Sequence, residues 1–595
     1  VVATDSAVVD STGIIEMTFT GILDPTETYT LDYFADHNGD GECTSYPDDH
    51  VWHQSIGTPT GDTAGTIDHE GSTIDNAGCD SFSDEGGSES VDDDGDGYSE
   101  DDGDCDDTNA DFNPGASDAL LADYDCDGTI TEHDVGQADY SFAGEANYDE
   151  SGFVVTSAGD VDGDGLDDIL VGANKNDDGG TDAGKAYIIL GASLGATSEI
   201  DLADADYSFI GENSGDYAGW VVDNAGDVDG DGLGDILVGA WKYGSDESQV
   251  GKTYLIFGAS LGGSSEIHLG DADYTFVGEA TGDHAGWSVS TAGDVDGDGL
   301  DDILIGALQN DNGESDAGTT YLILAASLGS VTDIELADAD YSFVGEGADD
   351  QSGHSVSTAG DVDGDGLDDI LIGAHLNDEV GTDVGKTYIV LAASLGAQSA
   401  IRLSDADYSF VGENDEDYAG WSVFHAGDVD GDGLGDVLIG ALGNDDAGVE
   451  AGKTYLMLGA TLPSTTASMS LALADYIFVG EAEGDQNGHS VPTAGDVDGD
   501  GLDDILIGAN KNDEGGEAAG KCYLILGSSL GSTTEIDLAS VEHNFVGENA
   551  TDWVGRFVSD AGDVNGDGRD DILLGAYGWE SGQKAGKTYL ILSGL

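Results

Sequence analysis

Short apolar runs alternate with polar, glycine-rich stretches along most of the chain. In AGDVDGDGLDDILVGA, residues 158–173, an acidic stretch precedes the apolar run Ile169 to Val171, which ends at Gly172. A run this short, bounded by glycine, predicts a buried strand rather than a helix. FVVTSAG comes before the acidic stretch, and KAYIIL and DYSFIGE follow the apolar run. The pattern predicts four short strands in one unit.

The unit recurs at a nearly constant period. Its acidic stretches begin at Asp160, Asp227, Asp294, Asp361, Asp428, Asp496 and Asp563, with spacings of 67, 67, 67, 67, 68 and 67 residues. Seven four-stranded units predict an all-β, seven-bladed β-propeller, in which sheets are arranged around a channel. An open β-solenoid is the alternative.

The two ends of the repeat region indicate that the ring closes. The last repeat stops after KTYLIL without a fourth strand, whereas DYSFAGE, residues 139–145, precedes the first repeat. We expect this strand to pair in the last blade, because it would remove an exposed sheet edge.

Each acidic stretch has the spacing of a calcium loop. In the first, Asp160, Asp162, Asp164 and Asp168 take positions 1, 3, 5 and 9, and a glycine at position 6 allows the sharp turn. These carboxylates, with the main-chain carbonyl of Leu166 at position 7, are the hard oxygen ligands that Ca²⁺ prefers. The equivalent predicted ligands in the other repeats are Asp227, Asp229, Asp231, Leu233 and Asp235; Asp294, Asp296, Asp298, Leu300 and Asp302; Asp361, Asp363, Asp365, Leu367 and Asp369; Asp428, Asp430, Asp432, Leu434 and Asp436; Asp496, Asp498, Asp500, Leu502 and Asp504; and Asp563, Asn565, Asp567, Arg569 and Asp571.

The N-terminal part differs from the repeats. Residues 1–90 alternate apolar and polar positions between Pro and Gly turns, which predicts a small β-sandwich-like domain. Residues 91–135 are an Asp-rich linker that resembles thrombospondin type 3 and EF-hand calcium loops. Its expected calcium ligands are Asp92, Asp94, Asp96, Asp123, Asp125, Asp127, Thr129 and Asp134.

Residues 138–595 resemble the FG-GAP repeats of the integrin α-chain propeller. The resemblance rests on a Gly-aromatic pair near the first strand, as in Gly152-Phe153, a Gly-Ala pair after the second, as in Gly172-Ala173, and the D-x-D-x-D-G-x-x-D loop. It implies a calcium-binding propeller used in adhesion. Integrins carry such loops in only a few blades, whereas every repeat here has one, and no inserted domain interrupts the repeats. Integrin ligand specificity is therefore not expected.

The chain is strongly acidic. It has 125 Asp and Glu but only 13 Lys and Arg, a formal net charge of −112. This charge repels nucleic acid and anionic membranes, so neither is an expected partner. A solvated surface suited to salty water explains the excess most simply, and a cation-collecting surface is the alternative.

Cysteine usage indicates an oxidising, extracellular compartment. Cys43, Cys79, Cys105 and Cys126 lie in the segment with the least apolar core, where disulfides stabilise most. We expect Cys43 to pair with Cys79 and Cys105 with Cys126, although four cysteines allow other connectivities. Cys522 is expected to be a buried free thiol. No apolar run has the length of a membrane span, and the start at Val1 without Met is consistent with a processed secreted protein.

The repeats differ most at two sets of positions. One set starts the first strand, at Phe153, Trp220, Trp287, His354, Trp421, His489 and Arg556. The other follows Gly-Ala, at Asn174, Trp241, Leu308, His375, Leu442, Asn510 and Tyr577. Aromatics and an arginine near loops are typical of recognition hot spots, although aromatics that start an inner strand more often pack between blades.

The sequence contains no catalytic motif that we recognise. Its histidines are scattered, and the local cluster His50 to His53 lacks a metal-site spacing, so structural roles are expected. We expect a secreted, calcium-stabilised, non-enzymatic adhesion or surface-assembly protein that self-associates head-to-tail into a fibre or surface layer, or binds an extracellular protein. A glycan-binding, lectin-like propeller is the alternative, and a hydrolase or lyase ranks third.

Overall fold

The computed structural model describes residues 133–244, 248–463, 467–541, 543–579 and 584–593, and the backbone of three strands nearer the N-terminus. These strands, β1 (Tyr29–Asp36), β2 (Asp49–Gly57) and β3 (Ile74–Asp75), form one antiparallel sheet. The described residues contain no second sheet in this region, so the β-sandwich stays a prediction. The chain divides into two compact units, residues 1–116 and 117–595.

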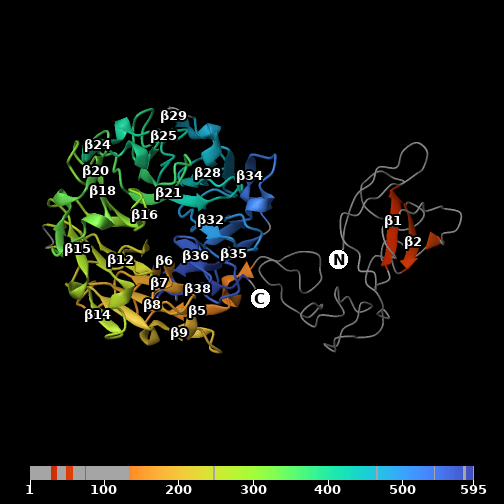
Figure 1. The fold of residues 1–595 in the computed structure, drawn as a ribbon, viewed down its shortest axis with the longest axis horizontal. Helices are drawn as coiled ribbons and strands as arrows, with labels where there is room; N and C mark the ends of the chain where they lie inside the picture. The colour runs from red at the N-terminus through yellow and green to blue at the C-terminus, as the bar shows by residue number, and fades with distance from the viewer. Residues whose placement is uncertain are drawn as a thin grey trace. The chain divides into compact units, whose positions relative to one another are not determined.

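The second unit is a β-propeller of seven sheets, which Figure 1 shows arranged around a common centre. This confirms the predicted all-β propeller. Each sheet has five strands rather than the predicted four. In the first blade, strands β6, β7, β8 and β10 are antiparallel neighbours, and β14 from the next repeat adds in parallel at the outer edge.

The fifth strand escaped the sequence pattern because it is only three or so residues long and carries a single inward apolar side chain. In β14 (Glu266–His268), Glu266 and His268 are exposed and only Ile267 is partly buried. A short, polar strand of this kind blunts the sheet edge against further pairing.

The strand bounds follow the repeat. The innermost strands are β6 (Ser151–Gly159), β11 (Val221–Gly226), β16 (Ala285–Gly293), β21 (Ser355–Gly360), β26 (Val423–Gly427), β31 (Thr493–Gly495) and β36 (Val558–Gly562). The second strands are β7 (Asp168–Ala173), β12 (Asp235–Ala240), β17 (Asp302–Ala307), β22 (Asp369–Ala374), β27 (Asp436–Ala441), β32 (Asp504–Ala509) and β37 (Asp571–Ala576). The third strands are β8 (Lys185–Ile189), β13 (Lys252–Ile256), β18 (Thr319–Ile323), β23 (Lys386–Val390), β28 (Lys453–Met457), β33 (Lys521–Ile525) and β38 (Lys587–Ile591).

The fourth and fifth strands complete the blades. The fourth are β10 (Tyr207–Ile210), β15 (Tyr274–Val277), β20 (Tyr341–Val344), β25 (Tyr408–Val411), β30 (Tyr476–Val479), β35 (Asn544–Val546) and β5 (Tyr140–Ala143). The fifth are β14, β19 (Asp333–Glu335), β24 (Ala400–Arg402), β29 (Ala467–Ser470), β34 (Glu535–Asp537), β4 (His133–Asp134) and β9 (Glu199–Asp201).

Short 3₁₀ helices flank the outer strands. One set follows the third strands: η5 (Gly191–Ser193), η7 (Gly258–Ser260), η9 (Ala325–Ser327), η11 (Ala392–Ser394), η13 (Gly459–Thr461) and η15 (Gly527–Ser529). The other follows the fifth strands: η4 (Val135–Gln137), η6 (Leu202–Asp204), η8 (Leu269–Asp271), η10 (Leu336–Asp338), η12 (Leu403–Asp405), η14 (Leu471–Leu473) and η16 (Leu538–Ser540). In the described part of the chain, no helix combines the length and the apolar composition that a membrane span requires.

The core lies between the blades. All residues of β7 and β8 are buried, because neighbouring sheets cover both faces of each blade. Leu170 and Ile188 of the first blade pack in one cluster with Ile236 of the second. Gly172 of the Gly-Ala pair allows this approach, since a Cβ there would meet the carbonyl oxygen of Gly219 in the next blade. Cys522 is buried and free, as expected.

The N-terminal end of the propeller supplies outer strands to two blades. β5 pairs antiparallel with β38 in the seventh blade, and β9 lies outside β5. Asp139 Oδ2 also accepts a hydrogen bond from the N–H of Leu592 at 2.8 Å. β4 is the fifth strand of the sixth blade, so His133 and Asp134, expected in the linker, belong to the propeller instead. The ring is thus joined through two blades.

Candidate functional site

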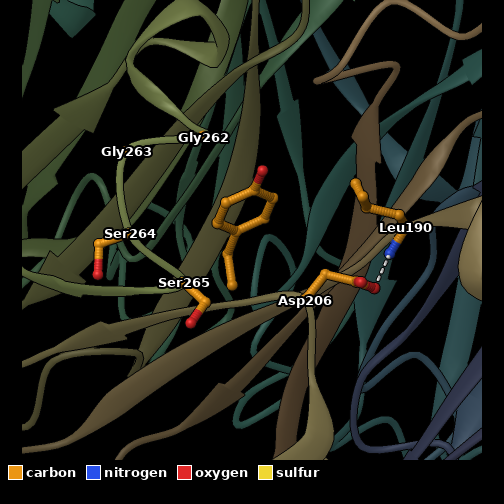
Figure 2. Close-up of a pocket in the computed structure, with 7 residues that line it drawn as sticks. Leu190, Asp206, Gly262, Gly263, Ser264 and Ser265 are labelled. Carbon is orange, nitrogen blue, oxygen red and sulfur yellow. Dashed lines mark hydrogen bonds between the residues drawn. The ribbon is translucent and has the colours of Figure 1, made fainter.

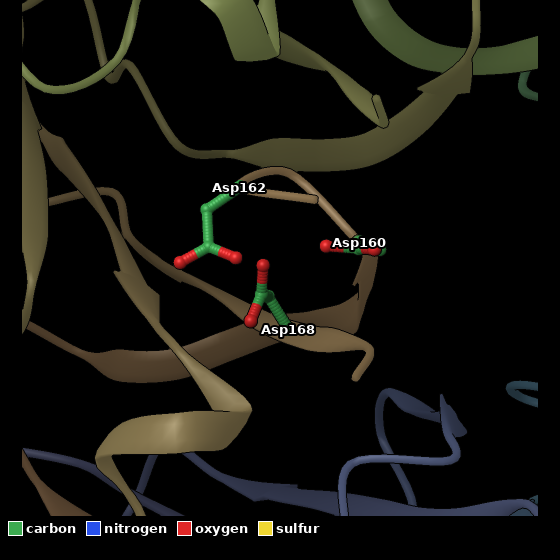
Figure 3. Close-up of side chains that lie close together, drawn as sticks. All are labelled: Asp160, Asp162 and Asp168. Carbon is green, nitrogen blue, oxygen red and sulfur yellow. The ribbon is translucent and has the colours of Figure 1, made fainter. Parts of the chain in front are cut away.

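The acidic loops bring carboxylates together at one end of the blades. β6 ends at Gly159 and the loop leads into β7 at Asp168. Carboxylate oxygens of Asp160, Asp162 and Asp168 lie within 4.8 Å of one another and face a common point (Figure 3). Six such triads occur among the described residues, including those at Asp227, Asp229 and Asp235; Asp294, Asp296 and Asp302; Asp361, Asp363 and Asp369; and Asp428, Asp430 and Asp436.

Backbone N–H groups orient the first aspartate of each loop. Asp160 accepts from the N–H of Gly163 at 2.7 Å and from the N–H of Gly165 at 2.9 Å, through its two carboxylate oxygens. Both glycines have positive φ angles, 78° and 90°, which favour glycine. The glycines of the motif therefore let the backbone hold the first carboxylate in position.

The last aspartate of each loop is buried. Asp168 accepts from the N–H of Val161 at 3.0 Å and from the N–H of Gly191 at 2.9 Å. Burial raises the pKa of Asp168 to about 7, although these two hydrogen bonds act in the opposite direction and lower it. Asp162 and Asp160 raise the pKa further by charge repulsion. Burial raises the pKa to about 7 at all the equivalent positions: Asp235, Asp302, Asp369, Asp436, Asp504 and Asp571.

This donor set fits a hard divalent cation. It consists of converging carboxylate oxygens, and a cation would relieve the repulsion and the burial cost together. The seventh loop is different, because Asn565 replaces an aspartate. Its amide Nδ2 lies 3.4 Å from Asp571 Oδ2, as a donor. Asn565 would have to turn its oxygen toward an ion, and its loop carries one charge fewer.

Other predicted ligands have different surroundings. Asp164 is outside the triad, and its Oδ1 accepts from the N–H of Leu166 at 3.0 Å. Asp134 accepts from the N–H of Gly136 at 2.9 Å and caps η4. The remaining linker ligands, from Asp92 to Thr129, lie outside the described residues. The four N-terminal cysteines also lie outside them.

The loops are also bonded to one another, which the sequence analysis did not anticipate. Asp167, at position 8 of the first loop, accepts from the N–H of Asp563 in the seventh loop at 2.9 Å. The equivalent bonds run from Asp227 to Asp301, Asp294 to Asp368, Asp428 to Asp503 and Asp496 to Asp570. Blades two and five have Gly234 and Gly435 at position 8. Recurrence of aspartate at this non-ligand position was the available signal.

At the other end of the inner strands, the variable residues form a ring. Phe153, Trp220, Trp287, His354, Trp421, His489 and Arg556 are here called the inner ring. Neighbouring members are in contact: the ring centroids of Phe153 and Trp220 are 4.7 Å apart, and those of His354 and Trp421 are 4.6 Å apart. The Arg556 guanidinium carbon lies 4.8 Å from the Phe153 centroid. The structure thus brings one residue of every blade together.

Each inner-ring residue follows a glycine with a positive φ angle. Gly219 has φ of 77°, and a Cβ there would meet the carbonyl oxygen of Lys185. Glycine is therefore required before the ring residue, while the ring residue itself is free to vary. This explains the Gly-aromatic pair of the repeat.

Strained residues surround the inner ring. Seven equivalent non-glycine residues have φ between 53° and 58°: Glu150, Tyr217, His284, Gln351, Tyr418, Gln486 and Trp553. This conformation costs about 1 kcal/mol or more for a side chain with a Cβ. Repeated strain in a loop is a feature of functional sites. We call these seven residues the rim.

The histidines of the inner ring are neutral structural residues. Nδ1 of His354 lies 2.9 Å from the carbonyl oxygen of Trp421 and donates to it. Nδ1 of His489 makes the same bond to Arg556 at 3.0 Å. Burial lowers the pKa of His354 to about 4. These two histidines link adjacent blades, consistent with the structural role expected for histidine.

A lysine network inside the blades was missed at the sequence level. Nζ of Lys252 pairs with Glu212 at 2.5 Å, and the hydroxyl of the buried Tyr254 donates to the same carboxylate at 2.9 Å. Corresponding pairs form at Lys185, Lys386, Lys453, Lys521 and Lys587. The recurring G-E and K-T-Y motifs were the available signal.

A shallow pocket of about 340 Å³ lies on the outer part of the first blade (Figure 2). In other blades the equivalent tyrosine is bonded to the loop after the third strand of the next repeat: the hydroxyl of Tyr274 donates to the carbonyl of Gly329 at 2.7 Å. Tyr207 does not make the equivalent bond among the described residues. Gly262 adopts φ of 101° and precedes a second glycine. The pocket is therefore explained by a local change in loop path.

Comparison with known proteins supports the repeat assignment. Residues 153–189, 285–323, 352–390, 487–525 and 558–591 match the FG-GAP repeat model. These matches lie in the five blades that have aspartate at position 8.

Similarity to individual proteins covers a part of the chain. Integrin alpha-PS2 of Drosophila melanogaster is 25% identical over 264 residues, 42% of this chain and 18% of that protein. Integrin alpha pat-2 of Caenorhabditis elegans is 27% identical over 272 residues, 43% of this chain and 20% of that protein. Phosphatidylinositol-glycan-specific phospholipase D of Bos taurus is 31% identical over 165 residues, 27% of this chain and 19% of that protein. The match thus spans about a fifth of each relative. The chain contains FG-GAP repeats in a seven-bladed propeller and is similar to integrin α-chains.

Proposed function

We propose that this protein is an extracellular, calcium-stabilised, non-enzymatic adhesion or surface-assembly protein that binds its partner through the inner ring and rim. The observation that carries the proposal is the contrast within each blade. One end repeats nearly the same acidic loop in every copy, and the other end presents a different set of side chains in each.

The composition of the inner ring and rim supports recognition. Tryptophan, tyrosine and arginine are the residues most enriched at binding hot spots. The rim side chains are held in a strained backbone conformation, which fixes their positions before a partner binds. Variation between repeats fits a surface that contacts an asymmetric partner.

The cation-binding loops support an extracellular, calcium-dependent protein. Extracellular calcium modules bind in the range of about 10⁻⁴–10⁻³ M, so such loops stay occupied outside cells. The resemblance to integrin α-chains points in the same direction. On this proposal calcium has a structural role, because the loops lie away from the inner ring.

A glycan-binding propeller is the second candidate. Trp220, Trp287 and Trp421 favour it, because all three are half-buried, Trp220 and Trp287 are in contact, and Trp421 follows beyond His354. An enzyme ranks third, since the ring histidines are engaged in interblade hydrogen bonds.

Binding by the full-length chain tests the proposal. Self-association would be measured by sedimentation, and glycan binding on an array, each in CaCl₂ and in EGTA. Trp287→Ala should weaken whichever binding occurs by at least about tenfold, the loss typical of a hot spot. Tyr274→Phe, on the outer strand β15, is the matched control and should bind normally. Absence of both activities, or equal loss in the two variants, would reject the proposal.

A further inference from the structure

The few basic residues of this acidic chain are unevenly placed. All 13 Lys and Arg lie after residue 132, and residues 1–132 contain none. Six are the buried lysines paired with glutamate inside the blades. Five others lie near the inner ring: Lys175, Lys242, Lys511, Arg556 and Lys584.

These five cations belong to four adjacent blades. Lys175, Lys242 and Lys511 follow the residue after Gly-Ala in blades one, two and six, and Arg556 and Lys584 belong to blade seven. Blades three, four and five have Gln309, Leu376 and Gly443 at the position of Lys175. We call the group of five the basic sector. It occupies one side of an otherwise uncharged or acidic surface.

Arg556 is the central cation of the sector. Its guanidinium lies against Phe153, and its carbon is 5.2 Å from the centroid of Tyr577. No ion pair joins Arg556 to a carboxylate among the described residues. Its Nε is buried and makes no hydrogen bond to any of them. The guanidinium is hydrogen-bonded to the Tyr577 side chain and lies in the field of Glu150, and its Nε remains as a donor for a further carboxylate.

Further buried polar atoms without a partner lie in the same four blades. They include Nε1 of Trp241, both amide atoms of Asn174 and Oδ1 of Asn510. Each of these residues follows Gly-Ala and lies beside a lysine of the basic sector. Unpartnered buried atoms occur in the other blades too, including Nδ1 of His375 at the same position in blade four. Buried polar groups are nearly always hydrogen-bonded, so those beside the lysines of the sector are available to a polar partner or ordered water.

Glu150 and Asp182 are acids near lysines of the sector, and Asp182 acts on Lys242 through its charge. Glu150 pairs with Lys175 at 2.9 Å and is 3.7 Å from Lys584, so one carboxylate is shared by two lysines. Nζ of Lys242 lies over the Tyr217 ring at 4.0 Å. Lysine or arginine over an aromatic ring keeps its charge and its donors for another acceptor.

We propose that the basic sector binds carboxylates of the Lys- and Arg-free N-terminal region, residues 1–132, of a second copy of the chain. Arginine binds carboxylates through two parallel hydrogen bonds, which gives direction as well as attraction. Arginine and lysine clusters recognise acidic segments by this chemistry. The inference rests on the proposed function and names its partner.

Such a contact joins different surfaces of the two copies. An interface of this kind is heterologous, so each bound copy presents a further N-terminal region and a further basic sector. Assembly would continue head-to-tail. Since the attraction is between opposite charges, it should weaken as salt is raised.

Sedimentation of the full chain in CaCl₂ tests the inference. The test variant is Arg556→Gln, and the matched control is Arg402→Gln, which removes the same charge away from the basic sector. We expect wild type and control to associate alike and the test variant to associate at least tenfold more weakly. A synthetic peptide of residues 98–116, with Cys105→Ser, should inhibit wild-type association and bind the test variant at least tenfold more weakly. Circular dichroism and melting in CaCl₂ would establish that both variants fold.

Several results would overturn the inference. Undiminished association of the test variant would place the contact elsewhere while leaving surface assembly intact. Equal loss in the control would show a general charge effect. A chain that stays monomeric, yet binds an oligogalacturonate through Arg556, would replace the N-terminal region by an acidic glycan and leave adhesion intact. A chain that neither associates nor binds glycans or cells would reject both the inference and the proposed function.

Discussion

The two ends of the propeller blades differ in what they allow to vary. At the loop end, positions 1, 5, 6 and 9 are identical in all seven repeats, whereas at the ring end no residue type fills all seven positions. The loop side chains must converge on one point, so each change removes a ligand or an anchor. At the ring end, glycine and positive φ angles set the chain path, so the side chains can vary from blade to blade without disturbing the backbone.

Variation at the loop end occurs in compensated pairs. Gly234 and Gly435 replace the aspartate at position 8 in blades two and five. In these two blades Asn224 and His425 lie beside a glycine of the preceding blade, Gly159 and Gly360 respectively. A Cβ on Gly159 would lie 2.9 Å from Nδ2 of Asn224, and one on Gly360 would lie 2.5 Å from Nε2 of His425. A larger side chain thus takes the space of the missing carboxylate.

Calcium removal should have the largest effect of all the changes considered, because it acts on the stability contributed by the loop end. A site at ten times its dissociation constant adds about 1.4 kcal/mol, so seven sites add about 10 kcal/mol, comparable with the whole stability of a domain. Calorimetry in EGTA should show melting lowered by more than about 10 °C. An unchanged melting temperature would mean that the loops are not structural cation sites.

Opening the ring should damage the propeller while leaving the chemistry of both ends intact. Deletion of residues 139–145 removes β5, exposes the edge of β38 and leaves β9 without a partner. We expect aggregation or early melting, measured by light scattering during heating. As a control, Tyr140→Phe keeps the strand and removes only the bond from its hydroxyl to the carbonyl of Gly195. Normal solubility of the deletion would contradict the importance of this strand.

The stability of the propeller should depend on pH through Asp223, which lies on the innermost strand β11 between the two ends. Burial raises the pKa of Asp223 to about 7, and its neighbours are Thr156, Ser290 and the acidic Asp560. Because the folded-state pKa lies above the usual 3.8, the carboxyl takes up a proton when the chain folds at a pH between about 4 and 7, so the stability of the folded protein falls as pH rises through this range. Asp223→Asn should therefore stabilise the protein at pH 8, by about 2 kcal/mol for this half-buried group, and much less at pH 5.

Denaturant unfolding of both proteins at the two pH values measures this effect. Asp560→Asn is the matched variant and should gain less at pH 8, since burial raises the pKa of Asp560 only to about 6. A gain that is equal at both pH values would argue against titration of Asp223.

The smallest expected effect is a difference in calcium affinity among the seven loops. The Asp563 loop should bind Ca²⁺ most weakly, because Asn565 supplies one charge fewer. Arg569 of that loop lies near the sixth loop: burial raises the pKa of Asp498 there, and the positive charge of Arg569 opposes this rise. Arg569→Leu restores the residue of the other blades and should strengthen calcium binding at the Asp496 loop by less than about tenfold. Calorimetric titration would measure it, and weaker binding in the variant would refute the idea.

Much of the architecture was fixed by local pattern. Seven copies of an acidic loop followed by D-I-L-x-G-A specify where β7 and its equivalents begin, because the loop needs its glycines and the strand needs its apolar run. The triad Asp160, Asp162 and Asp168 was also foreseeable, since its members lie within one short loop. The absence of a fourth strand from the last repeat pointed to the strand at 139–145.

Only the tertiary structure decided what depends on neighbouring blades. The fifth strands, the position-8 bonds such as Asp167 to Asp563, and the grouping of Arg556 with Phe153 join residues separated by a whole repeat or by the whole ring. A local sequence pattern cannot predict these contacts, because the two partners come together only when the ring of blades closes. The sequence by itself therefore determined the blade and its acidic loop, and ring closure determined the surface through which the protein is proposed to act.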